Sequence, residues 1–166
     1  PAEEIPQLLD PALNGTDLGL MSEAGTPCVA DPGSQLVAIA HEKNIRVVPM
    51  SGPSSITLAL MASGFNGQNF VFHGYLPVES RQRNAALKRL ENDAYRLDQT
   101  QIFIETPYRN MKLFEGILAS CSPETRLCIA ANLTTSDEMI KTLSLASWKK
   151  NPPAIHKQPA VFLIYK

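Results

Sequence analysis

The sequence predicts an α/β protein, because short apolar runs of strand length alternate with longer segments whose apolar residues recur at helical spacing. Its 166 residues are 44% hydrophobic and 19% charged, which excludes a disordered chain. No apolar stretch approaches the roughly 20 residues that a transmembrane helix needs, and no secretion signal opens the chain. The three cysteines are too scattered for a disulfide framework or a zinc site. We therefore expect buried thiols, no bound metal and a cytoplasmic location.

The first part of the chain repeats the order strand, loop, helix. The apolar runs at 18–21 and 45–48 are each long enough for one buried strand. Ser34 is suited to cap the helix that follows it, and Gly64 to end a later one. This order is typical of a parallel sheet with crossover helices. The expected elements are helices at 2–9, 35–43 and 55–63 and strands at 18–21 and 45–48.

The second part is richer in strand signals. Runs of aromatic and β-branched residues predict strands, and apolar residues at helical spacing predict two helices between them. Prolines at 152, 153 and 159 predict irregular structure before the last strand. The expected elements are strands at 70–72, 101–104, 127–131 and 160–165 and helices at 80–92 and 108–120.

The formal net charge of −1 is the sum of two unlike parts. Residues 1–66 carry two basic residues against seven acidic ones, and residues 67–166 carry thirteen basic residues against nine acidic ones. The sign changes within 64–69, whose glycines and asparagines are typical of a linker. We therefore predict two domains, 1–66 and 67–166, of which the second is basic.

A cluster of basic residues opens the first helix of the second domain. Arg81, Arg83, Lys88 and Arg89 are suited to the phosphate backbone of RNA, although a solvated charged face has the same composition. Tyr75, shortly before them, is compatible with stacking on a base and equally with packing in the core.

The segment 22–33 is a candidate ligand loop. It joins an expected strand to an expected helix and is longer than the usual connection of this type, and long loops are usually functional. Ligands of α/β proteins bind beyond the carboxyl ends of strands. Gly25 and Gly33 allow close approach of the backbone, and Thr26 and Asp31 can bond hydroxyls or amines. An ordinary connection with ordinary turn chemistry is the alternative.

A second strand-to-helix connection lies at 51–55. Ser54 and Ser55 are suited to cap the helix, and a helix N-terminus also presents free N–H groups to a ligand. Two such loops at neighbouring strand ends are expected to line one crevice.

Four ordered motifs carry a family resemblance. They read S-E-A-G-T-P followed by D-P-G at 22–33, P-M-S-G-P-S-S at 49–55, F-H-G-Y-L-P at 72–77 and E-T-P-Y-R at 105–109. In this order they resemble the tetrapyrrole methylase superfamily, and within it most closely the ribosomal RNA small-subunit methyltransferase I branch.

The resemblance implies S-adenosylmethionine (SAM) as the methyl donor, held in the cleft between two α/β domains of a homodimer. It places the loop from Gly25, Thr26 and Pro27 to Val29 against the methionine part and the ribose of the donor, and Asp31 is a further donor candidate in the same loop. The remaining residues that it implies for the donor site are Ser54 and Ser55, with Thr106, Ala131, Asn132, Pro159 and Ala160 beside the adenine.

Methyl transfer to a ribose hydroxyl benefits from a base or a nearby cation that helps the proton leave. Glu105 is the first candidate for the base or for alignment of the acceptor, and capping of the following helix is its alternative. Arg109, the second catalytic candidate, is suited to a phosphate or to a carboxylate partner. His73 is a candidate for proton transfer but also suits a structural hydrogen bond.

The resemblance implies methylation of a ribose 2′-oxygen in small-subunit rRNA. Methylation of a tetrapyrrole or another small molecule, and a non-catalytic SAM-binding module, are the alternatives. The family opens with a strand and a glycine-rich loop that nothing in this sequence matches. We therefore expect these residues to lack roughly the first third of the protein and the first domain to be incomplete, by analogy with the family.

Overall fold

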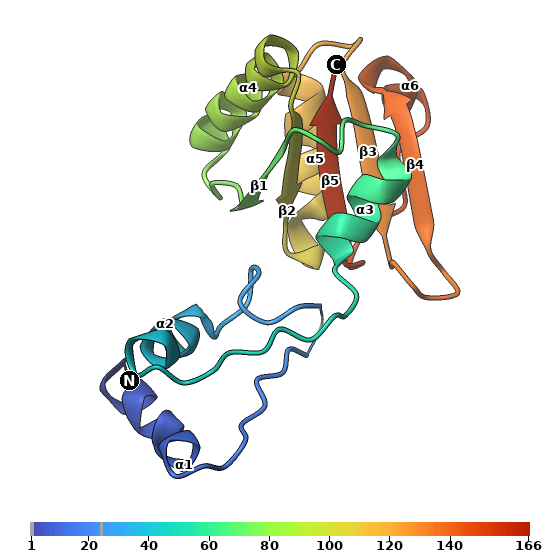
Figure 1. The fold of residues 1–166 in the computed structure, drawn as a ribbon. Coiled ribbons are helices and arrows are strands. Elements are labelled where there is room, and N and C mark those ends of the chain that lie inside the picture. The colour runs from blue at the N-terminus through green and yellow to red at the C-terminus, as the bar shows by residue number, and fades with distance from the viewer. Residues whose placement is uncertain (1, 24) are drawn as a thin grey trace. The chain divides into compact units, whose positions relative to one another are not determined.

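A computed structural model describes residues 2–23 and 25–166 (Figure 1). The chain divides into two compact units, Pro1–Ser54 and Ser55–Lys166. The α/β class predicted from the sequence is confirmed. The sequence analysis expects the boundary between residues 66 and 67, whereas the two units divide between Ser54 and Ser55. The earlier division follows because the helix that begins at Ser55 packs on the sheet of the second unit.

The first unit is helical in its described part. Its elements are the 3-10 helix η1 (Ala2–Leu9), α1 (Asp10–Leu13) and α2 (Ser34–Glu42). η1 and α2 are in contact, and each contributes a buried apolar residue, Leu9 and Ala40. The helices expected at 2–9 and 35–43 are thus present, the first in 3-10 form.

The two strands expected in the first unit are absent, and this part of the prediction is wrong. Residues 18–21 and 45–48 have no strand pairing, and most of their apolar side chains are exposed, with Leu18 48% and Val48 56% exposed. The physical reason is that a strand needs a neighbour to bond its backbone groups. Across residues 2–23 and 25–54, no strand offers that pairing.

The second unit, which the structure describes throughout, is built on one five-stranded sheet in the order β1-β2-β5-β3-β4. β1 and β2 are parallel and are joined by a helical crossover, whereas the other described pairs are antiparallel. The sheet is therefore mixed rather than parallel. The strands are β1 (Phe70–Tyr75), β2 (Thr100–Ile104), β3 (Arg126–Ala131), β4 (Met139–Ser144) and β5 (Ala160–Tyr165).

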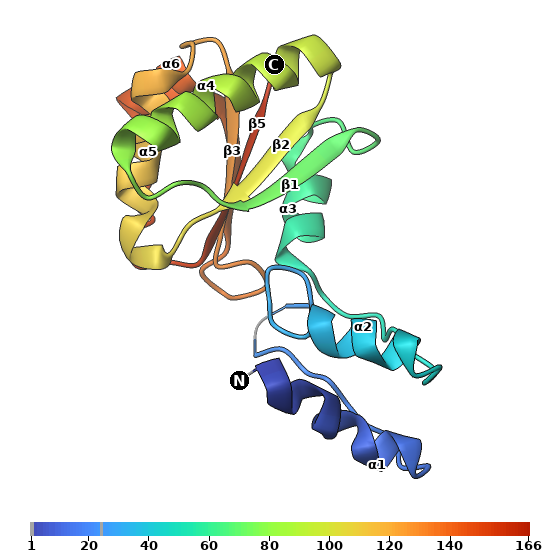
Figure 2. The same cartoon turned by 90° about the vertical axis from the view of Figure 1, so that its left-hand side faces the viewer.

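Helices cover both faces of this sheet (Figure 2). β5 is buried on both sides: Phe162 and Ile164 face the core under α4, α5 and α6, and Val161 and Leu163 face the core under α3. This explains its uninterrupted apolar sequence. The helices are α3 (Ser55–Ser63), α4 (Ser80–Leu97), α5 (Asn110–Ser120) and α6 (Leu145–Lys150), with the 3-10 helix η2 (Pro107–Arg109) before α5.

Two elements, β4 and α6, are missing from the sequence prediction. β4 is only half-buried and carries a lysine in its centre, so its pattern is weak. α6 is short, and tertiary contacts hold it: the buried indole of Trp148 donates to the Leu127 carbonyl at 2.8 Å and lies edge-on to Phe114. The hydroxyl of Ser144 caps it by accepting from the Ser147 N–H.

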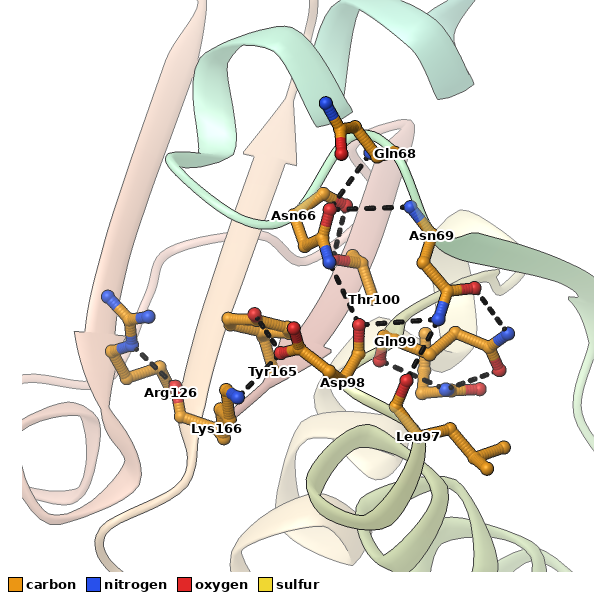
Figure 3. A network of polar contacts seen from close by, with 11 residues as sticks. Asn66, Gln68, Asn69, Leu97, Asp98, Gln99, Thr100, Arg126, Tyr165 and Lys166 are labelled. Atoms are coloured by element: carbon orange, nitrogen blue, oxygen red, sulfur yellow. Dashed lines mark hydrogen bonds and ion pairs between the residues drawn. The ribbon is translucent and has the colours of Figure 1, made fainter.

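A polar network closes the end of the sheet at which β1, β2 and β3 begin (Figure 3). The Asn66 amide donates to the Asp98 carbonyl at 2.9 Å, and the Asn69 amide donates to the Leu97 carbonyl at 2.9 Å. The Asp98 carboxylate accepts from Lys166 and from the Tyr165 hydroxyl, and these bonds lower the pKa of Asp98. The network thus fixes the segment that leads from α3 into β1.

Candidate functional site

One end of the sheet gathers five of the residues that the sequence analysis assigned to the donor. Ala131 at the end of β3 and Ala160 at the start of β5 are direct partners in the strand register. The Asn132 N–H donates to the Pro159 carbonyl at 3.0 Å, and Asn132 adopts the left-handed conformation, with φ +49°. Thr106 follows the end of β2, the other neighbour of β5. Thr106, Ala131, Asn132, Pro159 and Ala160 therefore share one end of the sheet.

Small side chains dominate this end. Ala131 and Ala160 are buried, and Pro159 continues the same backbone. Because Ala131 and Ala160 belong to the core, the accessible part of this sheet end consists of the exposed Pro159 and the half-buried Thr106 and Asn132.

Glu105 and Arg109 form an ion pair at the same end. The Glu105 side chain is 1% exposed, and its Oε1 accepts from Arg109 Nη2 at 2.7 Å, from Arg109 Nε at 3.0 Å and from the Thr106 N–H at 2.7 Å. This carboxylate therefore fixes the turn that contains η2. The arrangement favours a positioning role for the pair, with the Glu105 carboxylate as the partner of Arg109.

The loop 22–33 lies in the first unit and contains several left-handed residues. Gly25 and Gly33 have φ of +102° and +128°, and the Val29 N–H donates to the Thr26 carbonyl at 3.4 Å. The φ of Gly33 is one that residues with a Cβ rarely adopt, so the loop favours glycine there. Of the remaining predicted donor residues, Gly25 and Val29 are exposed and Thr26, Pro27, Asp31 and Ser54 are half-buried, while Ser55 begins α3.

The basic residues of α4 do not share one face. Arg81, Lys88 and Arg89 are exposed, whereas Arg83 is 8% exposed and donates from Nη1 to the Val78 carbonyl at 3.0 Å. Arg83 packs against α5 at Gly116, where an added Cβ would lie 3.3 Å from its Nε. Arg83 is therefore not available for RNA, unlike the other three predicted residues.

The spacing of the basic residues along the helix could have shown that Arg83 lies on a different face from Arg81 and Lys88. Residues two apart in a helix point about 200° from each other, so Arg81 and Arg83 lie on opposite faces once the helix is assigned. Side-chain type alone grouped them in the sequence analysis. Arg81 and Lys88, by contrast, are seven residues apart and lie on one face.

The structure also settles two open side-chain assignments. His73 Nε2 lies 2.7 Å from Gln101 Oε1 on the neighbouring strand, so His73 makes a structural hydrogen bond, the second of its two expected roles. Tyr75, at the end of β1, is 56% exposed and so is not a core residue. Tyr108 in η2 is 72% exposed, and Lys157 Nζ lies 5.7 Å from the centre of its ring, an arrangement that the sequence analysis did not single out.

The part of the chain that the structure describes holds neither a cluster of metal-ligating side chains nor a membrane-spanning helix. Across residues 2–23 and 25–166, no group of three or more His, Cys, Asp or Glu side chains is placed to hold a metal ion. In that range no helix combines the length and the apolar character needed to cross a bilayer.

Two relatives at more than 30% identity are ribosomal RNA small subunit methyltransferases I. The protein from Vibrio cholerae is 34% identical over 139 residues, which cover 84% of this chain and 47% of the relative. That from Mesorhizobium japonicum is 37% identical over 143 residues, which cover 86% and 47%. The chain thus spans about half the length of the curated relatives it matches.

Solved structures confirm the fold at lower identity. The methyltransferase CobJ matches with a TM-score of 0.65 and 18% identity, over 99% of this chain and 71% of its own. Uroporphyrin-III C-methyl transferase from Thermus thermophilus, solved in complex with S-adenyl homocysteine, matches with a TM-score of 0.58 and 17% identity, over 99% and 73%.

The resemblance seen in the motifs is confirmed at the level of the family. The family model for tetrapyrrole (corrin/porphyrin) methylases matches residues 2–148, which is most of the chain and includes all four motifs. The chain therefore belongs to the tetrapyrrole (corrin/porphyrin) methylase family.

Proposed function

We propose that the chain is part of a SAM-dependent methyltransferase that modifies a ribose 2′-oxygen of small-subunit rRNA. The observation that carries the proposal is the identity of 34–37% to proteins named ribosomal RNA small subunit methyltransferase I. The exposed Arg81, Lys88 and Arg89 on α4 support an RNA substrate, because a small-molecule enzyme has no need of a basic helix face. A homodimer in the cytoplasm is part of the same proposal.

The residues fit the donor that the family implies. SAM, when bound, supplies a methyl group on a positively charged sulfur. The sheet end formed by Ala131, Asn132, Pro159 and Ala160 is proposed for the adenine, because the exposed Pro159 and the half-buried Asn132 place an apolar ring beside a polar side chain there. The loop 22–33 suits the methionine part, because its left-handed glycines bring the backbone close to a ligand. Ser54, Ser55 and Thr106 complete the proposed donor residues.

The protein's contribution to the reaction is positioning. Methyl transfer is an in-line displacement, so its rate depends on holding the acceptor oxygen opposite the leaving sulfur. The Glu105–Arg109 pair fixes the backbone from Thr106 through η2, and α4 holds the phosphates of the RNA. Because the Glu105 side chain is buried and paired with Arg109, we assign Glu105 and Arg109 to positioning rather than to proton transfer.

Charge reversal on α4 tests the RNA assignment. The triple variant with Glu at Arg81, Lys88 and Arg89 should lose rRNA methylation and keep SAM binding, because the three side chains are exposed and unneeded for folding. The matched control reverses Lys149 and Lys150, two exposed lysines of α6, and should retain methylation. The readouts are ribose-methylation mapping in a deletion strain that expresses each variant, and calorimetry with SAM.

The outcomes separate the function classes. Full rRNA methylation by the α4 variant would refute the RNA contact. A wild-type protein that binds SAM but restores no rRNA methylation would favour a tetrapyrrole, another small molecule or a non-catalytic role. If the wild-type protein does not bind SAM, every hypothesis of SAM-dependent methyl transfer is refuted.

A further inference from the structure

Tyr108 and Lys157 form an exposed aromatic and cationic pair that no step of the proposed mechanism uses. The Tyr108 side chain is 72% exposed although η2 around it is firmly held, and Lys157 Nζ lies 5.7 Å from the ring centre. An exposed tyrosine ring forgoes the burial that aromatic side chains normally gain. A nearby ammonium group adds a cation–π attraction but leaves the rest of the ring open.

The backbone beneath the pair is fixed from both sides. The Lys157 N–H donates to the Pro107 carbonyl at 3.1 Å, which joins the turn 155–158 to η2. The fully buried Asn110 donates to the carbonyls of Ile155 at 3.2 Å and Gln158 at 2.6 Å. The ring and the ammonium group therefore extend from a rigid support, which lowers the entropy lost on binding.

The pair lies beside the proposed donor residues. Tyr108 is two residues after Thr106, and Lys157 is two residues before Pro159. Both segments adjoin the sheet end at which Asn132 bonds to Pro159. Tyr75, exposed at the end of β1, reaches the same end, because it is the register partner of Ile104 in β2.

We infer that Tyr108 and Lys157 form a nucleotide platform, on which the Tyr108 ring stacks with a base of the acceptor RNA and the Lys157 ammonium contacts a neighbouring phosphate. Stacking on aromatic rings is the main way in which proteins hold unpaired bases, and lysine beside the ring supplies the charge for the backbone. The inference rests on the proposed function and adds the place at which the acceptor nucleotide is held, distinct from the basic face of α4.

Substitutions at Tyr108 and at Lys157 test the platform in the full chain. Tyr108→Ala should raise the Kd for a short fluorescein-labelled single-stranded RNA of mixed sequence roughly ten-fold, measured by fluorescence anisotropy, whereas Tyr108→Phe keeps the ring and should stay within about two-fold. Lys157→Ala should weaken binding and reduce the slope of log Kd against log salt by about 0.7, the loss of one phosphate contact. Phe70→Ala, at an exposed aromatic residue where β1 begins at the other end of the sheet, is the control and should bind RNA normally.

Calorimetry with SAM and methylation of small ribosomal subunits separate the alternatives. The inference requires that Tyr108→Ala lose RNA affinity and methylation while its SAM affinity and thermal unfolding match the wild type. It is overturned if Tyr108→Ala binds RNA like the wild type, if Phe70→Ala loses as much, or if SAM affinity falls instead, which would assign the ring to the donor. A wild-type protein that binds SAM but neither binds nor methylates RNA refutes the proposed function, whereas loss of the platform alone leaves that function standing.

Discussion

Removal of the Arg109 guanidinium should destabilise the second unit by about 2 kcal/mol. Arg109→Met keeps a long side chain but leaves the Glu105 carboxylate, 1% exposed, with the Thr106 N–H as the one remaining partner that the structure assigns to its Oε1. Breaking a fully buried ion pair in this way costs about 3–5 kcal/mol, and breaking a pair on the surface costs under about 1 kcal/mol. Because the Arg109 side chain is 34% exposed, water screens the pair on one side, and we place the cost between these limits.

The reverse substitution should be milder. Glu105→Gln leaves a neutral amide whose oxygen still accepts from the Thr106 N–H, and it leaves the charge on the partly solvated arginine. We expect a loss of about 1 kcal/mol, since no buried charge is left unpaired. The double variant should lose less than the sum of the two single losses, because both single variants break one interaction.

Urea unfolding followed through tryptophan fluorescence measures these losses in the right part of the chain. Trp148 is the only tryptophan in the sequence, and it is buried in the second unit against Phe114. A loss below about 0.5 kcal/mol for Arg109→Met, typical of a substitution on the surface, would refute the role of the pair. So would a larger loss for Glu105→Gln than for Arg109→Met.

Two further predictions concern the core of the second unit. Thr142→Val should lower the free energy of unfolding by about 1 kcal/mol, because the Thr142 hydroxyl donates to the Ser63 carbonyl of α3 at 2.8 Å. Thr142→Ser keeps the hydroxyl and is the control. Equal losses for the two variants in urea unfolding would contradict the hydrogen bond. Burial raises the pKa of Cys121 from 9.0 to about 12 and also raises that of Cys128. At neutral pH a thiol reagent should therefore modify the half-buried Cys28 much faster than Cys121 and Cys128, and equal rates for the three thiols would refute this. The free energy of unfolding should fall as the pH rises from 9 toward 12, because the thiols of Cys121 and Cys128 ionise in the unfolded chain before they do so in the folded one.

Much of the fold is local and was accessible from the sequence. The helix at Ser80 begins where Glu79 accepts from two backbone N–H groups, and the apolar spacing of Leu87, Leu90 and Ala94 marks its buried face. The strand at 160–165 follows from an unbroken apolar run. β4 and α6 were missed because their sequences are weakly patterned and their stability comes from pairing with β3 and from the burial of Trp148.

The candidate site was accessible only in part. The motifs named Glu105, Thr106 and Arg109 together, but the ion pair and its role in fixing η2 depend on burial, which a motif does not state. Asn132 and Pro159 are distant in sequence and meet only because β3 and β5 pair. Tyr108 belongs to the motif at 105–109, but the motif gave no sign of its exposure, which is a property of the surface around it.

The sequence by itself determined the family, the α/β class and the residue types available for a donor and for RNA, because motifs and periodicity are local properties of the chain. The tertiary structure alone decided which strands form and which charges are free. Residues 18–21 have a strand-like sequence and form no strand, because no neighbour bonds their backbone groups in the described first unit. Arg83 has the chemistry of an RNA contact and is buried, because Gly116 lets α5 pack against it.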